Sequence, residues 1–332
     1  MNQIIRGSKE SYPWTCDFLT RNYNFRDFYY SETSKPINSK INLLYEQVKS
    51  FFLLLFNIKK YRKSNIILSI GYSTLTLVFL YKLRLIRFNR IYWWGFFIHD
   101  TKYFLFFRIL LRLFSTKKLY FIVFSEYEKK KYSEVMGIKD TNLLYVPYGD
   151  WNSAIKIEDA PGKTMDYYFS GGYSNRDYKK LIEAFRTVDK QLIIICSKNN
   201  RDILEMDIPG NIKIYTDMAS DEFDKYLRES KAVILPFKHN SGASGMSVML
   251  RCMRNKKVVI VTRTDAIQEY VDDGISGFVI DNLQNELTPI IERLEKDQKL
   301  CSELRLNLYK KYTEKYSYKA IRPYLAKIIN ES

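Results

Sequence analysis

The segment AVILPFKHNSGASGMSVMLRCMRNKKVVIVT, residues 232–262, decides the fold class. Its uncharged apolar start, 232–237, predicts a buried strand. A loop of small residues then leads into Met-Ser-Val-Met-Leu-Arg-Cys-Met, which predicts a helix, and a second apolar strand follows at 257–262. A strand, a helix and a strand joined by short loops form a parallel unit whose strands are buried on both faces.

The same alternation of apolar strands and amphipathic helices extends along the chain. Further strands are predicted at 65–70, 90–98, 119–125, 142–149, 165–172, 191–197, 211–216 and 277–280, and helices at 102–116, 126–137, 175–188, 220–230 and from 286 onward. Ser220 is the expected N-cap of its helix. The polar stretch 150–164 is typical of a linker. The sequence therefore predicts an α/β protein with two Rossmann-like parallel-sheet domains, residues 1–150 and 151–332.

The composition is that of a globular protein, and it predicts neither a structural metal site nor a disulfide framework. The chain has 332 residues, of which 46% are hydrophobic and 27% charged. Its four cysteines lie far apart and it has only two histidines, so neither a zinc site nor a disulfide framework is expected, and a reducing compartment is the default. The first residues lack the apolar core of a signal peptide.

The positive charge is concentrated in the first half. Residues 1–150 hold 24 Lys and Arg against 11 Asp and Glu, whereas residues 151–332 hold 29 against 26. Basic residues between aromatic ones suit an anionic membrane surface or nucleic acid, but they also occur where Lys and Arg extend from the edge of a core. The uncharged stretch 64–81 is too polar for a membrane span, and a buried strand followed by a helix is expected instead.

Two loops at predicted strand ends carry the chemistry of an anion site. One is the Gly/Ser loop that opens the helix near Gly245, since free N–H groups at a helix start bind anions. It lies in a window, 231–264, that holds seven Lys and Arg and no carboxylate. The other is the turn Gly171-Gly172 with Arg176 close behind it. Ligands of open α/β sheets bind beyond the carboxyl ends of the strands, so the two loops together can hold a diphosphate.

These motifs resemble those of the GT-B glycosyltransferases, most closely family 4. The resemblance covers roughly residues 119–295 and is carried by SEYEKKKYSEVMGIKDTNLLYVPYGDW (125–151), FSGGYSNRDYKKLIEAF (169–185) and VILPFKHNSGASGMSVMLRCMRNKKVVIVTRTDAIQEYVDDGISGFVID (233–281). It implies two domains facing across a cleft. The second domain would bind a nucleotide-sugar and the first an acceptor, with no metal ion or other cofactor, and the last helix can cross back to the first domain.

The resemblance also implies roles for individual residues. Arg176 would contact the diphosphate beside Gly171 and Gly172, and Glu269 the ribose of the donor. In FFIHD (96–100), His99 and Asp100 would contact the transferred sugar or move a proton. The loop and helix start would add further donor contacts from Lys238, Ser244, Gly245, Met246 and Ser247.

The chain departs from the family 4 pattern in its opening segment. Family 4 enzymes usually carry two glutamates eight positions apart on this loop and helix, and alignment on LRCM places Ala243 and Arg251 there. We expect Arg251 either to recognise a negative charge on the substrate, such as that of a uronic acid, or to pair with Glu269 and orient it.

Each candidate also has an ordinary structural explanation. Arg176 can pair with Asp177 or Glu183 on a solvated helix face. His99 can be a buried or surface histidine without a catalytic role, and Glu269 a surface acid. Adjacent carboxylates at 272–273 rarely converge on one ion, so no metal site is expected there.

The sequence and the resemblance together predict a glycosyltransferase. It would be cytoplasmic, peripheral at the inner face of the membrane, and would use a nucleotide-sugar donor and a lipid-linked or other membrane-proximal glycan acceptor in bacterial surface polysaccharide assembly. Two alternatives stay open. One is a non-catalytic GT-B relative that binds a glycan or a partner protein. The other is a nucleic-acid-binding protein, which the charge favours but for which no motif is present.

Overall fold

The computed structural model divides the chain into two compact units. The first contains Met1–Pro147, Trp151–Ser153 and Ile321–Ser332, and the second contains Tyr148–Asp150 and Ala154–Ala320. The structure describes residues 2–8, 17, 19–21, 25–31, 48–49, 51–52, 54–57, 59, 64–68, 71–98, 104–114, 116–150, 164–238 and 245–330.

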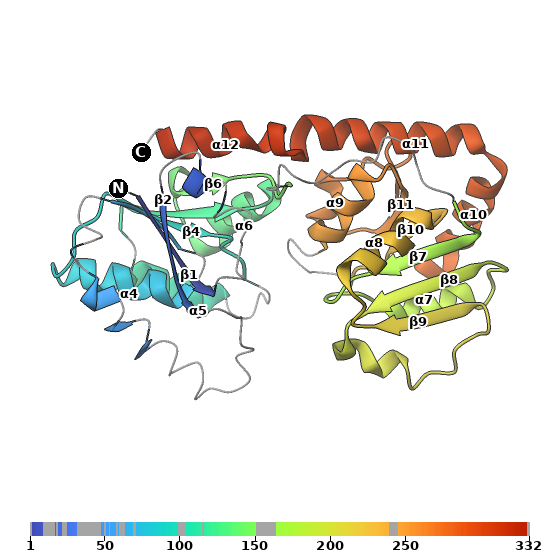
Figure 1. Cartoon of the computed structure of the whole chain (residues 1–332), viewed down its shortest axis with the longest axis horizontal. Coiled ribbons are helices and arrows are strands. Elements are labelled where there is room, and N and C mark those ends of the chain that lie inside the picture. Colours follow the sequence, from blue (N-terminus) through green and yellow to red (C-terminus); the bar gives the residue numbers. More distant parts are fainter. Residues whose placement is uncertain are drawn as a thin grey trace. The chain divides into compact units, whose positions relative to one another are not determined.

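The first unit is built on a six-stranded parallel sheet with the strand order β2-β1-β3-β4-β5-β6. Its strands are β1 (Asn2–Ser8), β2 (Phe25–Ser31), β3 (Asn65–Leu68), β4 (Arg90–Trp94), β5 (Leu119–Val123) and β6 (Leu143–Tyr145). Its helices are α4 (Gly71–Lys82), α5 (Phe104–Phe114), α6 (Glu126–Met136), the 3-10 turn η2 (Asp140–Asn142) and α12 (Tyr318–Asn330), most of which belongs to this unit (Figure 1).

Alternation along β4 explains how this sheet is covered. Ile91 and Trp93 join the core that α4, α5 and α6 form with one face of the sheet. Tyr92, between these two residues, faces the other side of the sheet, where its hydroxyl donates to the carbonyl of Ile328 in α12 at 3.2 Å. The sheet is thus buried on both faces, as expected for a parallel sheet.

The second unit repeats this plan with the strand order β12-β11-β10-β7-β8-β9, again all parallel. The strands are β7 (Tyr167–Gly171), β8 (Gln191–Cys196), β9 (Ile212–Thr216), β10 (Ala232–Leu235), β11 (Val258–Thr262) and β12 (Phe278–Ile280). The helical segments are α7 (Tyr178–Phe185), η3 (Lys198–Ile203), α8 (Ser220–Glu229), α9 (Met246–Arg254), η4 (Ile267–Glu269), α10 (Leu283–Lys296), α11 (Gln298–Lys311) and the π-helical η5 (Tyr312–Tyr316).

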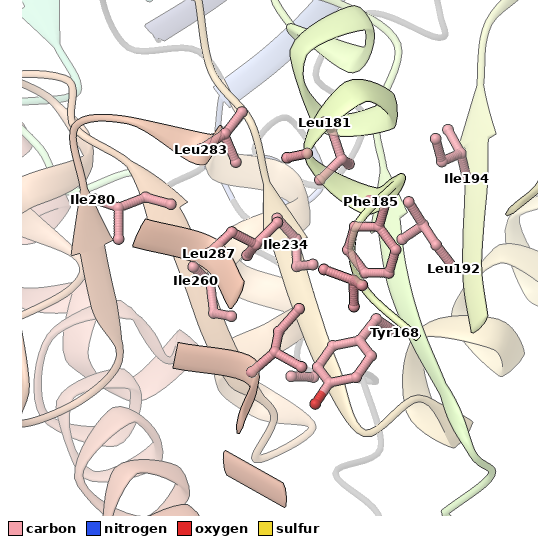
Figure 2. Packing of buried hydrophobic residues seen from close by; sticks show 14 of the residues in the cluster. Tyr168, Leu181, Phe185, Leu192, Ile194, Ile234, Ile260, Ile280, Leu283 and Leu287 are labelled. Carbon is pink, nitrogen blue, oxygen red and sulfur yellow. The ribbon is translucent and has the colours of Figure 1, made fainter. Parts of the chain in front are cut away.

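The core of this unit lies between one face of the sheet and the helices α7 and α10. Figure 2 shows Phe185 of α7 and Leu287 of α10 close to Ile234 and Ile260 of the central strands. Phe169 of β7 faces the other side of the sheet, where it packs edge-on against Phe223 of α8 with ring centroids 5.2 Å apart. Helix α8 therefore covers the opposite face, and the carboxyl ends of β7 and β10 lie between the two helical layers.

The predicted fold class, an α/β protein with two parallel sheets, is confirmed. The buried strand and following helix expected within 64–81 are present as β3 and α4, and in the described part of the chain no helix has the length and apolar character of a membrane span. The strand expected at 90–98 stops at Trp94 because Gly95 turns the chain with φ of 65°. Ser220 is not an N-cap but the first residue of α8, which Ala219 precedes.

Two strands at the start of the chain were not predicted. β1 and β2 pair in parallel over their whole length, from Asn2 beside Phe25 to Ser8 beside Ser31. Polar residues interrupt both segments, NQIIRGS and FRDFYYS, so neither shows the uninterrupted apolar run by which most of the other strands were identified.

Candidate functional site

A cavity of about 320 Å³ lies beyond the carboxyl ends of β7 and β10 in the second unit. This is the edge at which open parallel sheets bind their ligands. Two arginines, two helix starts and several small residues form the cavity, and no carboxylate is among its lining residues. The lining consists of Gly172, Tyr173, Ser174, Arg176, Ser220, Phe223, Gly245, Ser247, Val248 and Arg251.

Glycines let the backbone approach the arginine at the centre of this cavity. Gly172 has a φ of +133°, and a Cβ added to it would lie 2.6 Å from Nη2 of Arg176. Gly245 has a φ of +87°, and its Cβ would lie 2.1 Å from the ring of Phe237. Both positions therefore require glycine for conformation and for space. The predicted glycine-rich turn and helix start do meet around Arg176.

Arg176 is almost completely buried, with 3% of its surface exposed. Its Nε donates to the carbonyl of Gly171 at 3.3 Å and its Nη1 to the carbonyl of Ser174 at 3.0 Å. The guanidinium also lies over the ring of Phe237, 4.4 Å from its centroid. Burial lowers the pKa of Arg176, but a guanidinium stays protonated in proteins. The cavity therefore contains a fixed, buried positive charge.

The structural alternative for Arg176 is wrong, because neither expected carboxylate pairs with it. Asp177 caps α7 by accepting from the backbone N–H of Lys180 at 3.3 Å, and Glu183 pairs with Arg186 at 2.9 Å. Asp177 thus caps one N–H of α7, and neither Asp177 nor a residue of α7 is in the cavity lining, so this helix start does not contribute to the cavity. Within the described residues, Arg176 forms no salt bridge. A buried charge without a counter-ion is costly, so an anionic ligand would compensate it.

The start of α9 provides the N–H groups that were expected there. Its N-cap is Gly245, which has no side chain to cover the N–H groups of Met246, Ser247 and Val248. Helix α8 likewise begins at the cavity, through Ser220, without a side-chain cap. The start of α9, which has no acidic residue in its first turn, therefore favours negative charge in the cavity, whereas Asp221 and Glu222 in the first turn of α8 compensate the dipole of that helix.

Arg251 lies one turn further along α9 and lines the same cavity. Its Nη1 donates to Oδ1 of Asp224 at 3.0 Å, its Nη2 donates to Oγ of Ser220 at 3.3 Å, and its guanidinium lies 5.2 Å from the ring centroid of Phe223. The expected partner Glu269 is thus replaced by Asp224 of α8. No sequence pattern marked Asp224, because the two residues come together only through the packing of α8 against α9.

Several predicted donor-binding residues lie outside the cavity lining. Met246 is buried, and its Sδ accepts from the hydroxyl of Tyr270 at 3.0 Å. Glu269 belongs to η4, where its backbone carbonyl accepts from the hydroxyl of Tyr316 at 2.8 Å. Lys238 is exposed just after β10. Ser244, His99 and Asp100 lie outside the described residues, so their roles stay predictions.

The window without carboxylates, 231–264, is not a region of uncompensated charge. Four of its seven cations pair with acids from other parts of the chain: Lys231 with Asp166 and Glu295, Arg251 with Asp224, Arg254 with Asp150, and Arg263 with Asp281. The buried amine of Lys257 donates to the carbonyls of Arg228 and Ser230. Among these cations, only Arg251 also lines the cavity.

Five lining residues were missed by the sequence analysis: Tyr173, Ser174, Ser220, Phe223 and Val248. The first two directly follow the predicted glycine turn and could have been included with it. Phe223 carries no sequence signal, because it reaches the cavity from α8. As for metals, the described part of the chain contains no group of three or more His, Cys, Asp and Glu side chains placed to hold an ion.

Comparison with known proteins identifies the class to which this site belongs. Residues 154–311 match the family of glycosyl transferases group 1. The match covers nearly all of the second unit, which contains the cavity, and just under half of the whole chain. The resemblance to glycosyltransferases that the motifs suggested is therefore confirmed: residues 154–311 form a group 1 glycosyltransferase domain. No curated protein matches the chain.

Solved structures extend the similarity to the fold of the entire chain. A glycosyltransferase from Rickettsia africae ESF-5 is 13% identical with a TM-score of 0.71, over 99% of this chain and 98% of that one. Anabaena Alr3699/HepE in complex with UDP is 11% identical with a TM-score of 0.74, over 100% of both chains. Sucrose-phosphate synthase from Thermosynechococcus elongatus is 12% identical with a TM-score of 0.75, over 100% and 99%. The chain therefore has the two-domain GT-B fold, and its second unit matches the group 1 glycosyl transferases.

Proposed function

We propose that this glycosyltransferase transfers a sugar from a nucleoside-diphosphate donor to a lipid-linked or other membrane-proximal glycan in bacterial surface polysaccharide assembly. The observation that carries the donor assignment is the buried, carboxylate-free environment of Arg176 beside the uncapped start of α9. A diphosphate supplies the negative charge that this environment lacks.

The same groups would stabilise the leaving diphosphate. As the bond between the anomeric carbon and the diphosphate oxygen breaks, its electron pair moves onto that oxygen. The oxygen of the acceptor hydroxyl bonds to the carbon, and its proton passes to the departing diphosphate. Arg176 and the N–H groups of Met246 and Ser247 can meet the developing negative charge without rearrangement, because both are fixed by packing. We propose that these groups suffice without a metal ion or another cofactor.

Features of the relatives support the finer parts of the proposal. The Anabaena protein is described in complex with UDP and with UDP-glucose, and another structure with the same fold is a lipopolysaccharide outer core galactosyltransferase, with a TM-score of 0.67. We further propose that His99 and Asp100 act on the transferred sugar, that Lys238, Ser244 and Glu269 assist donor binding, and that the first unit works at the inner face of the membrane.

Substitution of Arg176 tests the donor assignment. UDP, GDP, dTDP and their parent nucleosides would be titrated calorimetrically into the wild-type protein and Arg176→Ala. Because a hydrogen bond to a charged group contributes about 1.5–3 kcal/mol, the affinity for the preferred diphosphate should fall roughly tenfold to a hundredfold, while that for the nucleoside changes little. Arg263→Ala is the control, since Arg263 pairs with Asp281 outside the cavity lining.

Two results would contradict the proposal. Equal losses for the nucleoside and the diphosphate would show that Arg176 only supports the loop. Diphosphate binding without turnover of any nucleotide-sugar would favour the non-catalytic alternative. Arg176→Lys keeps the charge but not the planar fork, and it should retain part of the diphosphate affinity if the charge is what matters.

A further inference from the structure

The first unit contains a second cavity, of about 400 Å³, at the edge of the sheet where β5 begins. It lies between the ends of α5 and α6 and the segment leading into β5. Its lining consists of Leu111, Arg112, Thr116, Lys117, Leu119, Phe121, Met136, Gly137, Ile138, Lys139 and Asn142. We refer to it as the β5 groove.

The β5 groove combines an apolar floor with a cationic rim. Five buried hydrophobic side chains form the floor, namely Leu111, Leu119, Phe121, Met136 and Ile138. Lys117 and Lys139 are exposed at the rim, and neither forms an ion pair with another described residue. The nearest acid in sequence, Asp140, pairs with Lys129 at 3.4 Å. No carboxylate lines the groove in the part of the chain that the structure describes.

A stripe on α5 continues the same chemistry away from the groove. Leu105, Arg108, Ile109 and Arg112 are spaced three, four and seven residues apart and therefore share one face of the helix. All four are exposed, Leu105 to 67% and Ile109 to 54%. Arg112 belongs to both the stripe and the groove lining. Exposed apolar side chains among arginines, on a helix without any acidic residue, are the pattern of a helix that lies on an anionic lipid surface.

We propose that the β5 groove binds one anionic phospholipid of the membrane, whose acyl chain lies on the apolar floor and whose phosphate lies near Lys117, Lys139 and Arg112. This inference rests on the membrane setting proposed above and deepens it by naming the lipid class and the binding surface. The lipid in the β5 groove anchors the protein to the membrane and is not the glycosyl acceptor. The groove lies where β5 begins, whereas chemistry in parallel sheets occurs at the carboxyl ends of the strands.

Vesicle flotation with the full-length protein tests the charge requirement. Vesicles of phosphatidylcholine alone and with phosphatidylglycerol would be compared for the wild type and for Lys117→Gln with Lys139→Gln. A Lys or Arg near an anionic surface changes partitioning about fivefold, so the double variant should bind roughly 30-fold more weakly to the anionic vesicles. The control replaces Lys299 and Lys310 of α11, which are 88% and 74% exposed, by glutamine, so that the net charge falls equally.

Thr116→Trp tests whether a chain enters the groove, because its indole can occupy the groove without a change of charge. Thr116→Val controls for the hydroxyl, whose oxygen accepts from the backbone N–H of Lys118 at 3.4 Å. Dihexanoyl-phosphatidylglycerol, kept below its micelle concentration, is the probe. We expect saturable binding to the wild type and Thr116→Val, and at least a tenfold loss in Thr116→Trp with an unchanged circular dichroism spectrum.

The outcomes separate the groove from simpler explanations. If the two control lysines matter as much as Lys117 and Lys139, the attraction is diffuse and the proposal is overturned. If vesicle binding depends on those lysines but monomeric lipid binds equally to Thr116→Trp, the surface is electrostatic only and no chain enters. UDP affinity, measured on the same samples, reports the proposed donor site independently, so the loss of one function is distinguishable from the loss of the other.

Discussion

Replacing Arg251 by glutamine tests the part of the site where this chain departs from the family 4 pattern. Arg251 lines the cavity beyond β7 and β10, but its Nη1 is paired with Asp224 at 3.0 Å. If the pair only connects α9 to α8, the variant should lose stability and keep its substrate preference. If Arg251 recognises a charge on the substrate, the preference for an acidic donor should fall instead. Because Asp224 already compensates Arg251, we expect the first result.

The size of the effect follows from the burial of the pair. The side chains of Arg251 and Asp224 are 25% and 20% exposed, which places the pair between a surface salt bridge and a buried one. Asp224 retains Arg254, whose Nη2 lies 3.9 Å from its Oδ2, so its charge is not left alone. A loss of about 1.5–2 kcal/mol is therefore expected. At about 2–4 °C per kcal/mol for a domain of this size, Tm should fall by about 3–8 °C.

Thermal unfolding and binding assays would be run on the same variants. Arg263→Gln is the matched control, because its partner Asp281 lies 2.8 Å away in an exposed pair whose loss should cost at most about 0.5 kcal/mol. Asp224→Asn completes a double-mutant cycle with Arg251→Gln. UDP-glucuronic acid and UDP-glucose would report donor preference. An unchanged Tm together with a lost preference for the acidic sugar would refute a purely structural role of Arg251 and support charge recognition. An unchanged Tm with unchanged preference would refute both explanations.

Two further predictions concern the glycine turn and the acid stability of the second unit. Gly172→Ala should weaken UDP binding at least tenfold, since the added Cβ would lie 2.6 Å from Nη2 of Arg176. Gly137→Ala is the control: its φ is +68° but no atom lies within 4 Å of the added Cβ, so it should leave UDP binding intact and cost about 1 kcal/mol of stability. Burial opposes ionisation of Glu295, but hydrogen bonds from Lys231, Lys190 and Tyr168 prevail and lower its pKa to about 2. Because the unfolded chain binds this proton near pH 4.5, the stabilisation is present above that pH and is lost as the pH falls toward 2. Urea unfolding from pH 7 to pH 3 should therefore show a steeper loss for the wild type than for Glu295→Gln, and parallel curves would contradict the assignment.

The sequence predicted the framework because local patterns determine it. Most strands of both sheets, apart from β1 and β2, are short apolar runs bounded by loops, and their length and the flanking turn residues identify them. The glycine turn before Arg176 and the start of α9 were located for the same reason. Both depend on small residues at fixed positions beside a strand end.

The partners of the charged residues could not be predicted, because they come from distant segments. Arg251 and Asp224 are 27 positions apart, and only the packing of α8 against α9 brings them together. Asp177 was considered as an alternative partner of Arg176, but its side chain caps its own helix, as N-cap residues commonly do. Pattern reasoning thus located the cations of the site more reliably than their counter-ions.

Arg251 occupies the position where the family 4 pattern has a glutamate. One wall of the cavity therefore offers hydrogen-bond donors in place of acceptors, while its charge stays nearly balanced. The usual glutamate of the family 4 pattern offers acceptors, whereas Arg251 and the hydroxyl of Ser220 offer donors. Asp224 neutralises Arg251 from behind, since it pairs with the guanidinium and is absent from the lining. Among the described residues, the positive charge of the cavity that has no counter-ion belongs to Arg176 and the start of α9. We therefore expect a ligand that brings negative charge to Arg176 and acceptor oxygens to Arg251, which the diphosphate and the hydroxyls of a nucleoside diphosphate would supply.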